Sequence, residues 1–411
     1  MCNFAPEMTT KRLLLTLTTL LTVVSAQGQY LRLAGDAERT ALYLDLDKIW
    51  NYNLYEHSRW GGGLRLSVHD LFCADGYIGY GTKDQKFKWG LTLDALHPSV
   101  GRHIYLSALY DLEAAGSRRL QNASLSDIGS LSAFMSHRMS HVERVTIGWR
   151  QDISQRLQLG AAIRYSAEER LFDAYGLVYP TSYYNPNAKT LFGFTEVLFD
   201  LKLNRHLHFH LLLGDSEESY NNERMRYLRM LLQYDNDFNL NPFTLHIFAQ
   251  GGWSDGLNHA VPYSRMFDLG GTWSSPVYFR NSLLTARPNE FTANAFAFVS
   301  VVLQTSKPLY STYSSILNAG SNPTPFIGFN AAWGALWGMN ANGQRAWQQL
   351  GLQAPYLGIV EPLVGINGIL RWGLVDYGFA TAYRVTPLQA PYHYTEPLDN
   401  LTLLLTATIT L

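Results

Sequence analysis

The chain has 411 residues, a formal net charge of −1 at pH 7 and 16% charged residues, whereas typical soluble domains carry roughly 25%. No basic cluster recurs, which excludes nucleic acid as the expected partner. No segment reaches the ~18 consecutive apolar residues of a transmembrane helix. Aromatic residues make up 13%, with 25 Tyr and 10 Trp, and this exchange of charge for Tyr and Trp is typical of a lipid-facing surface.

The N-terminus has the pattern of a secretory signal. Lys11 and Arg12 precede an apolar run over 13–24, and small residues follow it. We therefore predict a cleaved signal peptide over 1–28 and an exported mature chain. Cys73 is the single cysteine beyond this segment, so no intramolecular disulfide is expected.

Beyond a short periplasmic N-terminal segment expected over 29–38, the sequence alternates between apolar and polar residues. The segment after three glycines at 61–63 is the clearest example. In a strand, its apolar side chains fall on one face and its polar ones on the other: Leu64, Leu66 and Val68 against Arg65, Ser67 and His69. In a membrane barrel the apolar set contacts lipid and the polar set faces the lumen.

Segments of about ten residues with this period recur along the chain and are the signature of a transmembrane barrel. A large soluble β-sandwich has the same periodicity, but the signal, the low charge and the small polar side chains favour the membrane. We predict an all-β transmembrane antiparallel β-barrel over 39–411, of about 16 strands with 14 as the alternative. The sixteen predicted strands are 39–46, 62–69, 74–83, 86–95, 103–112, 142–151, 155–167, 188–202, 206–213, 224–235, 242–252, 293–305, 323–337, 355–369, 372–384 and 398–411.

The connections between these strands predict the orientation. Bacterial barrels have an even strand number, short periplasmic turns and long outer loops. One connection breaks the rule, because 306–322 would be a long periplasmic segment. The predicted outer loops are 47–61, 113–141, 168–187, 253–292, 338–354 and 385–397, and the predicted periplasmic turns are 152–154, 203–205 and 370–371.

The final strand, "LTLLLTATITL", ends the chain on an amphipathic alternation that suits barrel closure. Many such barrels end in an aromatic residue, whereas this one ends in Leu411. We expect this strand to contact the barrel-assembly machinery and the outer surface to contact outer-membrane lipid. The predicted location is the outer membrane of a Gram-negative bacterium.

Two motifs, "YNLYEHSRWGGGLRLSV" and "GYIGYGTKDQKFKWGLTL", resemble the start of the barrel in an uncharacterised family of Gram-negative outer-membrane proteins. Longer members of that family carry an N-terminal carboxypeptidase-regulatory-like domain, and its barrels are distantly similar to the BamA-like assembly superfamily. "NEFTANAFAFVSVVLQ" is similar to a later landmark of the family. Leu54 and His57 depart from the family pattern, and no regulatory-like domain fits ahead of residue 39. The resemblance implies a fold and a location, not a reaction.

Four residues at the start of the barrel are candidates for the lumen or for the family motif: Tyr52, Asn53, Glu56 and Arg65. Glu56 has no second carboxylate within its motif, so a capping or plugging role suits it better than acid–base work. We assign no catalytic residue.

Histidines form the most conspicuous polar feature. His206, His208 and His210 share one face of a predicted strand, and His246 lies on a nearby one. Such a set can bind zinc or copper, but carboxylate or Cys partners at a fixed spacing are not visible. We therefore predict no metal and no cofactor, and expect these histidines to line the lumen.

Three functions remain open. The sequence favours a non-enzymatic pore or structural transport barrel. The alternatives are a hydrolase acting on lipid or peptide at the lumen or rim, and a protein-assembly or surface-export pore, which rests on fold analogy alone. A small solute and an exported polypeptide are the transported partners left open.

Overall fold

The computed structural model describes most of the predicted strands and few of the connections between them. The described residues are 24–26, 30–36, 39–53, 55–69, 71–97, 101–114, 139–170, 191–204, 206–218, 224–257, 261–262, 265–268, 292–306, 324–337, 359–372, 375–384 and 401–409.

One 19-stranded sheet dominates the molecule. Its N-terminal strands are β1 (Val24–Ala26), β2 (Tyr30–Asp36), β3 (Thr40–Asp45), β4 (Trp50–Asn53), β5 (His57–Val68), β6 (Phe72–Gly81), β7 (Phe87–His97), β8 (Arg102–Ala114) and β9 (Met139–Ser154). The others are β10 (Leu157–Arg170), β11 (Leu191–Leu203), β12 (Leu207–Glu218), β13 (Arg224–Asn239), β14 (Phe243–Gly256), β17 (Ala295–Thr305), β18 (Thr324–Trp337), β19 (Ile359–Trp372), β20 (Val375–Arg384) and β21 (Leu401–Ile409). A 3-10 turn, η1 (Leu46–Lys48), separates β3 from β4, and β15 (Phe267–Asp268) pairs with β16 (Thr292–Ala293) outside the sheet.

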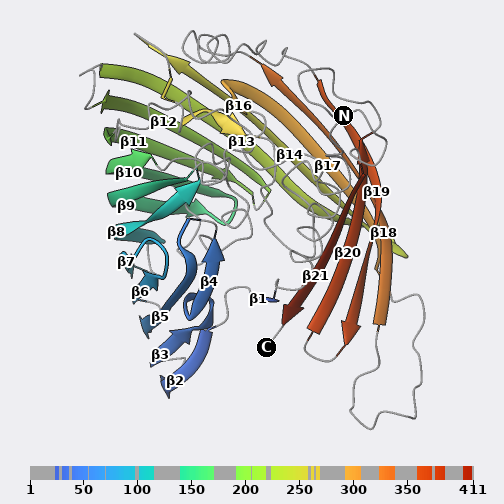
Figure 1. Ribbon diagram of the computed structural model, residues 1–411, viewed down its shortest axis with the longest axis horizontal. Helices are drawn as coiled ribbons and strands as arrows, with labels where there is room; N and C mark the ends of the chain where they lie inside the picture. Colours follow the sequence, from blue (N-terminus) through green and yellow to red (C-terminus); the bar gives the residue numbers. More distant parts are fainter. Residues whose placement is uncertain are drawn as a thin grey trace, which may run out of the picture.

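Strands that follow one another in the chain pair antiparallel throughout this sheet, with two exceptions. β4 pairs with β5 alongside β3, and β1 pairs parallel with β21. The sheet curls through β2 to β21 so that its two ends face each other across the molecule (Figure 1). Within the described part of the chain, no helix has the length and apolar character needed to cross a membrane.

All sixteen predicted strands overlap a strand of the structure, and β1, β2 and β4 are additional. β2 lies inside the segment expected to be short and periplasmic, where it pairs with β3. The predicted outer loop 47–61 is wrong, because β4 and β5 pair within it and a turn at 55–56 precedes β5. Alternation fails as a guide there because the three glycines carry no side chain to alternate.

Connection lengths divide the barrel into two ends. The short-turn end holds the tight turns after β5, β9, β11 and β13, and the long-connection end holds the links after β8, β10, β14 and β18. The predicted turns are displaced: 152–154 lies inside β9, 203–205 becomes 204–206, and 370–371 lies inside β19. The connections at 338–354 and 385–397, and 306–322 beyond its first residue, fall outside the described residues.

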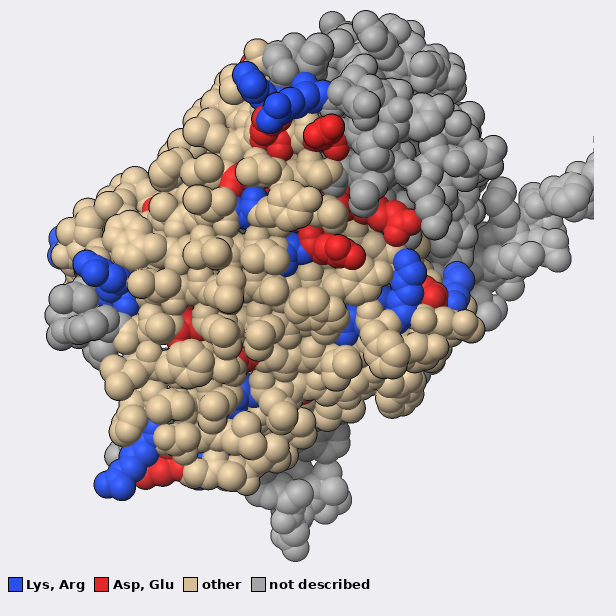
Figure 2. Space-filling model, turned by 90° about the vertical axis from the view of Figure 1, so that its left-hand side faces the viewer, with Lys and Arg blue, Asp and Glu red and all other residues tan. Residues whose placement is uncertain are grey.

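The two faces of the sheet have inverted polarity relative to a soluble domain. Large apolar side chains stand exposed on the outer face, among them Ile163, Ile147 and Phe87 at 63%, 59% and 61% exposure. Charged side chains are buried on the inner face, among them Lys88 and Glu196 at 0%. Uncharged residues cover most of the face shown in Figure 2. An apolar exterior around a charged interior is what lipid contact requires.

The strand after the three glycines follows this rule. Leu64 and Leu66 are 50% and 37% exposed, while Arg65 turns the other way and lies over the Tyr30 ring at 4.9 Å. The expected faces are therefore confirmed for these residues. His69 does not face the lumen, because it lies exposed in the turn after β5 with a φ of 47°.

One row of aromatic side chains marks the outer face near the long-connection end. Trp50, Trp60, Tyr80 and Phe87 are direct cross-strand neighbours on β4 to β7, and all four are exposed. Adjacent rings lie 6.4 Å apart in the Trp50–Trp60 pair and 4.9 Å apart in the Tyr80–Phe87 pair. Such a row is typical of a membrane–water interface.

Candidate functional site

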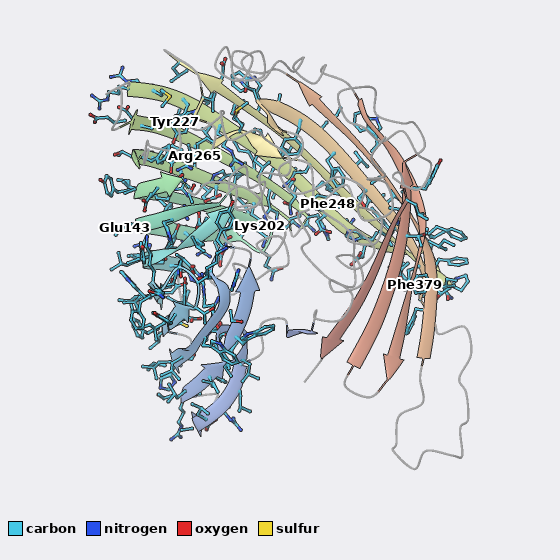
Figure 3. All side chains as sticks on the ribbon, in the orientation of Figure 1. Glu143, Lys202, Tyr227, Phe248, Arg265 and Phe379 are labelled. Atoms are coloured by element: carbon cyan, nitrogen blue, oxygen red, sulfur yellow. The ribbon has the colours of Figure 1, made fainter. Side chains whose placement is uncertain are left out.

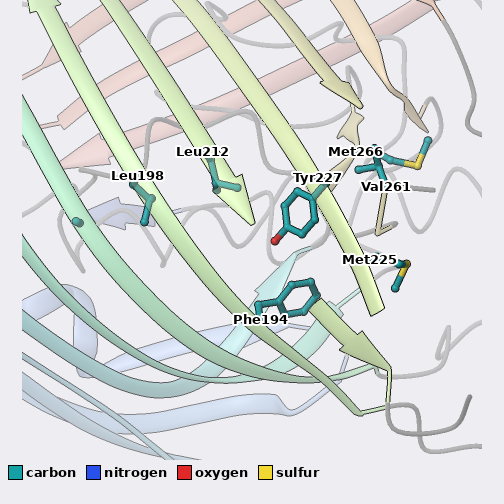
Figure 4. Close-up of a cluster of buried hydrophobic side chains, with 8 residues drawn as sticks. Phe194, Leu198, Leu212, Met225, Tyr227, Val261 and Met266 are labelled. Carbon is teal, nitrogen blue, oxygen red and sulfur yellow. The ribbon is translucent and has the colours of Figure 1, made fainter. Parts of the chain in front are cut away.

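Part of the connection between β14 and β17 lies against the inner face of the sheet. We call residues 261–262 and 265–268 the inner segment. Its Val261 and Met266 are 3% and 2% exposed and pack in a hydrophobic cluster with side chains from β10 to β13 (Figure 4). The prediction of a simple outer loop over 253–292 is therefore wrong for these residues. The cluster also contains Ala162, Phe194, Leu198, Leu212, Met225 and Tyr227.

Beside this cluster, a row of polar residues crosses four strands. Arg164, Glu196, Gly214 and Tyr227 are successive cross-strand partners on β10 to β13. Arg164 donates from Nε to Glu196 Oε2 at 2.6 Å, and the Tyr227 hydroxyl donates to Glu196 Oε1 across β12. Tyr227 can cross β12 only because residue 214 is glycine, since a Cβ there would lie 2.2 Å from the ring carbon Cζ. Glycine thus permits the contact that completes the row.

Arg265 connects the inner segment to this row. Its Nε lies 2.6 Å from Glu196 Oε1 and its Nη2 lies 2.7 Å from Glu168 Oε1, and its guanidinium stacks over the Phe194 ring at 4.0 Å. Figure 3 shows Arg265 beside Tyr227 on the inner side of the sheet. Burial alone would lower the pKa of Arg265, but the Glu168 and Glu196 carboxylates outweigh burial and raise the pKa well above its ordinary value. Arg265 therefore keeps its charge, and its hydrogen bonds to the two carboxylates are charge-assisted.

Phe267 provides a second attachment, on the other side of the cluster. Its ring is fully buried, lies 4.8 Å from the Phe296 ring and has the Arg229 guanidinium over it at 4.3 Å. A Cβ at residue 252 would lie 2.7 Å from Phe267 Cζ, so Gly252 forms the notch that accepts this ring. The inner segment therefore spans from β10 to β17 with Arg265 at one side and Phe267 at the other.

A second charged cluster lies on the inner face of β5 to β8, and we call it the N-terminal cluster. Arg59 Nε lies 2.7 Å from Glu56 Oε1, and Arg59 Nη1 donates to Asp111 Oδ2 at 3.0 Å. Lys88 Nζ lies 2.9 Å from Glu56 Oε2. Tyr77 donates to Asp111 across β7, where a Cβ on Gly90 would lie 2.4 Å from the tyrosine ring. This repeats the tyrosine-over-glycine arrangement of Tyr227.

The four motif residues chosen from the sequence lie in different parts of the structure. Glu56 joins the N-terminal cluster, whereas Arg65 contacts Tyr30 of β2. Tyr52 and Asn53 lie on β4 opposite Ser58 and His57, and their side chains fall outside the described part. A functional role for the four residues stays a prediction.

Three of the histidines singled out from the sequence contact aspartates of neighbouring strands, and Asp235 is contacted by both His206 and His246. His210 Nδ1 lies 2.7 Å from Asp200 Oδ1, His246 Nδ1 lies 2.5 Å from Asp237 Oδ1, and His206 donates to the Asp235 carbonyl at 2.9 Å. His208 follows on the same strand between His206 and His210. In the part of the chain that the structure describes, no group of three or more His, Cys, Asp or Glu side chains is arranged to hold a metal ion.

Sequence reasoning missed Arg265, Glu196 and Glu168. The residues that form this site lie 69 and 97 positions apart in the chain, so no local motif connects them. The local sequence also gives no distinguishing signal, because apolar and aromatic residues recur along the whole connection that contains Arg265, Met266 and Phe267.

Comparison with known proteins supports the fold. No family model and no curated protein matches the chain. BamA from Haemophilus ducreyi lacking POTRA domains 1–3 is similar in structure, with 10% identity, 93% of this chain and 75% of that chain covered, and a TM-score of 0.52. CdiB from Escherichia coli (10% identity, 91% and 63% covered, TM-score 0.48) and a bacterial polysaccharide outer membrane secretin (10%, 86% and 93%, TM-score 0.38) give weaker likenesses that carry no argument.

The similarity to BamA, the antiparallel sheet and the inverted polarity of its faces define the class of protein. The chain has the all-β fold of a transmembrane antiparallel β-barrel. This confirms the fold class predicted from the sequence.

Proposed function

We propose that this protein is an outer-membrane transport barrel of a Gram-negative bacterium, belonging to the uncharacterised family that its first strands resemble, and that the inner segment narrows its lumen. The observation that carries the proposal is the seat of Arg265, whose charge is buried against two carboxylates on the inner wall. A segment held against the inner wall occupies part of a lumen that in porins is a water-filled channel and in other barrels is plugged by loops.

The ion pairs of Arg265 favour the attached position of the inner segment. Removing one partner of a buried ion pair destabilises the remaining group by about 3–5 kcal/mol. The inner segment therefore stays on the wall until a stronger interaction displaces it. This is the behaviour of a controlled passage rather than of a permanently open one.

Single-channel conductance in planar bilayers tests this function. The mature wild-type protein is expected to show low conductance, and Arg265→Ala is expected to raise it severalfold because the inner segment loses both carboxylate contacts. Arg224→Ala is the matched control, since this arginine lies exposed on β13 and pairs with Asp215 at the surface. High conductance of the wild type, unchanged by Arg265→Ala, would contradict the proposal.

Location and orientation need a separate experiment. The protein is expected in outer-membrane fractions and should migrate faster on gels when unheated. In a Cys73→Ser background, Lys83→Cys at the long-connection end should react with an impermeant thiol reagent on whole cells, and Gln155→Cys at the short-turn end should not. The opposite labelling would reverse the topology.

A second candidate function is the export of a polypeptide. The similarity in fold to BamA favours it over a hydrolase, although at 10% identity this similarity extends to the fold alone. Both transport functions use the same inner segment, and they differ in the size and chemistry of what passes.

A further inference from the structure

The site beneath the inner segment has three parts, each matched to one side chain. Glu168 and Glu196 form an acidic part that holds Arg265. The apolar cluster on β10 to β13 holds Met266. The third part is the notch at Gly252, which holds Phe267.

These three parts recognise a peptide rather than a small ion. They take successive side chains, one cationic, one apolar and one aromatic, and all three are at least nine-tenths buried. The notch at Gly252 is itself selective for an aromatic ring. The Arg229 guanidinium lies 4.3 Å from the Phe267 ring centroid, and the Phe267 and Phe296 ring centroids lie 4.8 Å apart. Aromatic rings and guanidinium groups prefer such contacts over aliphatic ones.

Departure of the inner segment would leave this site in an unfavourable state. With the inner segment in place Glu168 is 4% exposed and Glu196 is 0% exposed, so its departure would break both ion pairs of Arg265 and expose these carboxylates and the apolar cluster together. An exchange in which another cationic chain takes the place of Arg265 avoids that loss. The same exchange would refill the apolar part and the notch.

On this basis we propose that the inner wall of β10 to β17 is a peptide-binding site, occupied in the resting protein by Arg265-Met266-Phe267 and, during transport, by a basic–apolar–aromatic segment of an exported polypeptide. This inference rests on the proposed transport function and names its substrate class. The inner segment acts as an internal competitor of the substrate.

The test uses the full mature protein in detergent, carrying Arg265→Ala and Phe267→Ala to vacate the site. A fluorescent peptide with the sequence VPYSRMFD, that of residues 261–268, is expected to bind this variant saturably by anisotropy and to bind the wild type at least about tenfold more weakly, a difference of about 1.4 kcal/mol. Peptides with Ala in place of Arg, or of Phe, should lose most of the binding. Adding Glu168→Gln to the variant should weaken the intact peptide but not the Arg-to-Ala peptide.

Two outcomes would overturn the inference. One is the absence of binding by a double variant that still shows heat-modifiable mobility, and the other is equal binding of a scrambled peptide. If the double variant fails to fold, Phe267→Ala alone vacates the notch and must gain a preference for the Phe-containing over the Ala-containing peptide. A rise in conductance of Arg265→Ala without peptide binding would remove this inference and leave the proposed function standing. Peptide binding without a conductance change would contradict the proposed narrowing of the lumen and leave only the peptide-binding site standing.

Discussion

The N-terminal cluster and the site beneath the inner segment are built from the same parts but serve different spans of the chain. Each has a buried arginine between two carboxylates and a tyrosine that crosses a glycine to reach one of them. In the N-terminal cluster, Arg59 lies on β5 itself and contacts Glu56 three residues away. At the other site, Arg265 comes from a connection and contacts the wall 69 and 97 residues away. The first cluster therefore fixes the sheet, whereas the second fixes a segment that is not part of the sheet.

The largest loss of stability is expected from substitution of Glu196. Glu196→Ala removes the acceptor of Arg164, Arg265 and Tyr227 together, leaving two guanidinium groups buried without this carboxylate, which should cost about 3–5 kcal/mol. The variant should lose its heat-modifiable mobility at a markedly lower temperature and should also conduct more than the wild type. Glu168→Gln, which removes the charge of a carboxylate that forms an ion pair with Arg265, serves as the milder control. A Glu196→Ala protein as stable as the wild type would contradict the central place of this carboxylate.

A similar loss of stability is expected from Arg59, but without the change in conductance. Arg59→Met leaves Glu56 and Asp111, which are 0% and 1% exposed, without their shared cation, so about 3 kcal/mol should be lost. The inner segment does not contact these residues, so single-channel conductance should stay at the wild-type level. A conductance increase equal to that of Arg265→Ala would show that the two clusters act as one.

The smallest changes in stability are expected from glycine substitutions. They distinguish a glycine that is required for steric reasons from one that is not. Gly214→Ala should destabilise the barrel by about 1–3 kcal/mol through overpacking, because its Cβ would lie 2.2 Å from Tyr227. Gly62→Ala should be within about 0.5 kcal/mol of the wild type, since nothing lies within 4 Å of its Cβ.

Denaturant titrations of unfolding in detergent measure both changes. The double variant Gly214→Ala with Tyr227→Ala is the decisive control, because removal of the ring should relieve the clash and make the effect of Gly214→Ala vanish in this background. A clash that persists without the ring would mean that the backbone, not Tyr227, requires glycine at 214.

The comparison also explains how far sequence reasoning reaches. Alternation identified all sixteen predicted strands, because a lipid-facing side chain at every second position is a physical requirement of the membrane. It also gave the faces of Leu64 and Arg65 correctly. Glu56 was a candidate because it matches the family motif, and its local partner Arg59 was not identified.

The inner segment escaped prediction for the complementary reason. Arg265 and Phe267 have no periodic context, and their partners become neighbours only after β10 to β17 have assembled. β4 was missed because it is short and the glycines of its partner β5 carry no apolar signal. Turn positions were displaced by a few residues because strands extend beyond the apolar belt through cross-strand polar pairs, such as Asp215 with Arg226 on β12 and β13.

The tyrosine that lies over a glycine has a consequence for how this chain can evolve. A larger residue at 214 would clash with the Tyr227 ring, and a larger residue at 90 would clash with the Tyr77 ring, so each is expected to lower stability while its tyrosine remains. Loss of either tyrosine, in turn, would withdraw a hydroxyl donor from a buried carboxylate. The two residues of each pair should therefore change together or not at all. Among descendants of this sequence we expect the glycine and the tyrosine of a pair to covary, even though they lie 13 positions apart in the chain.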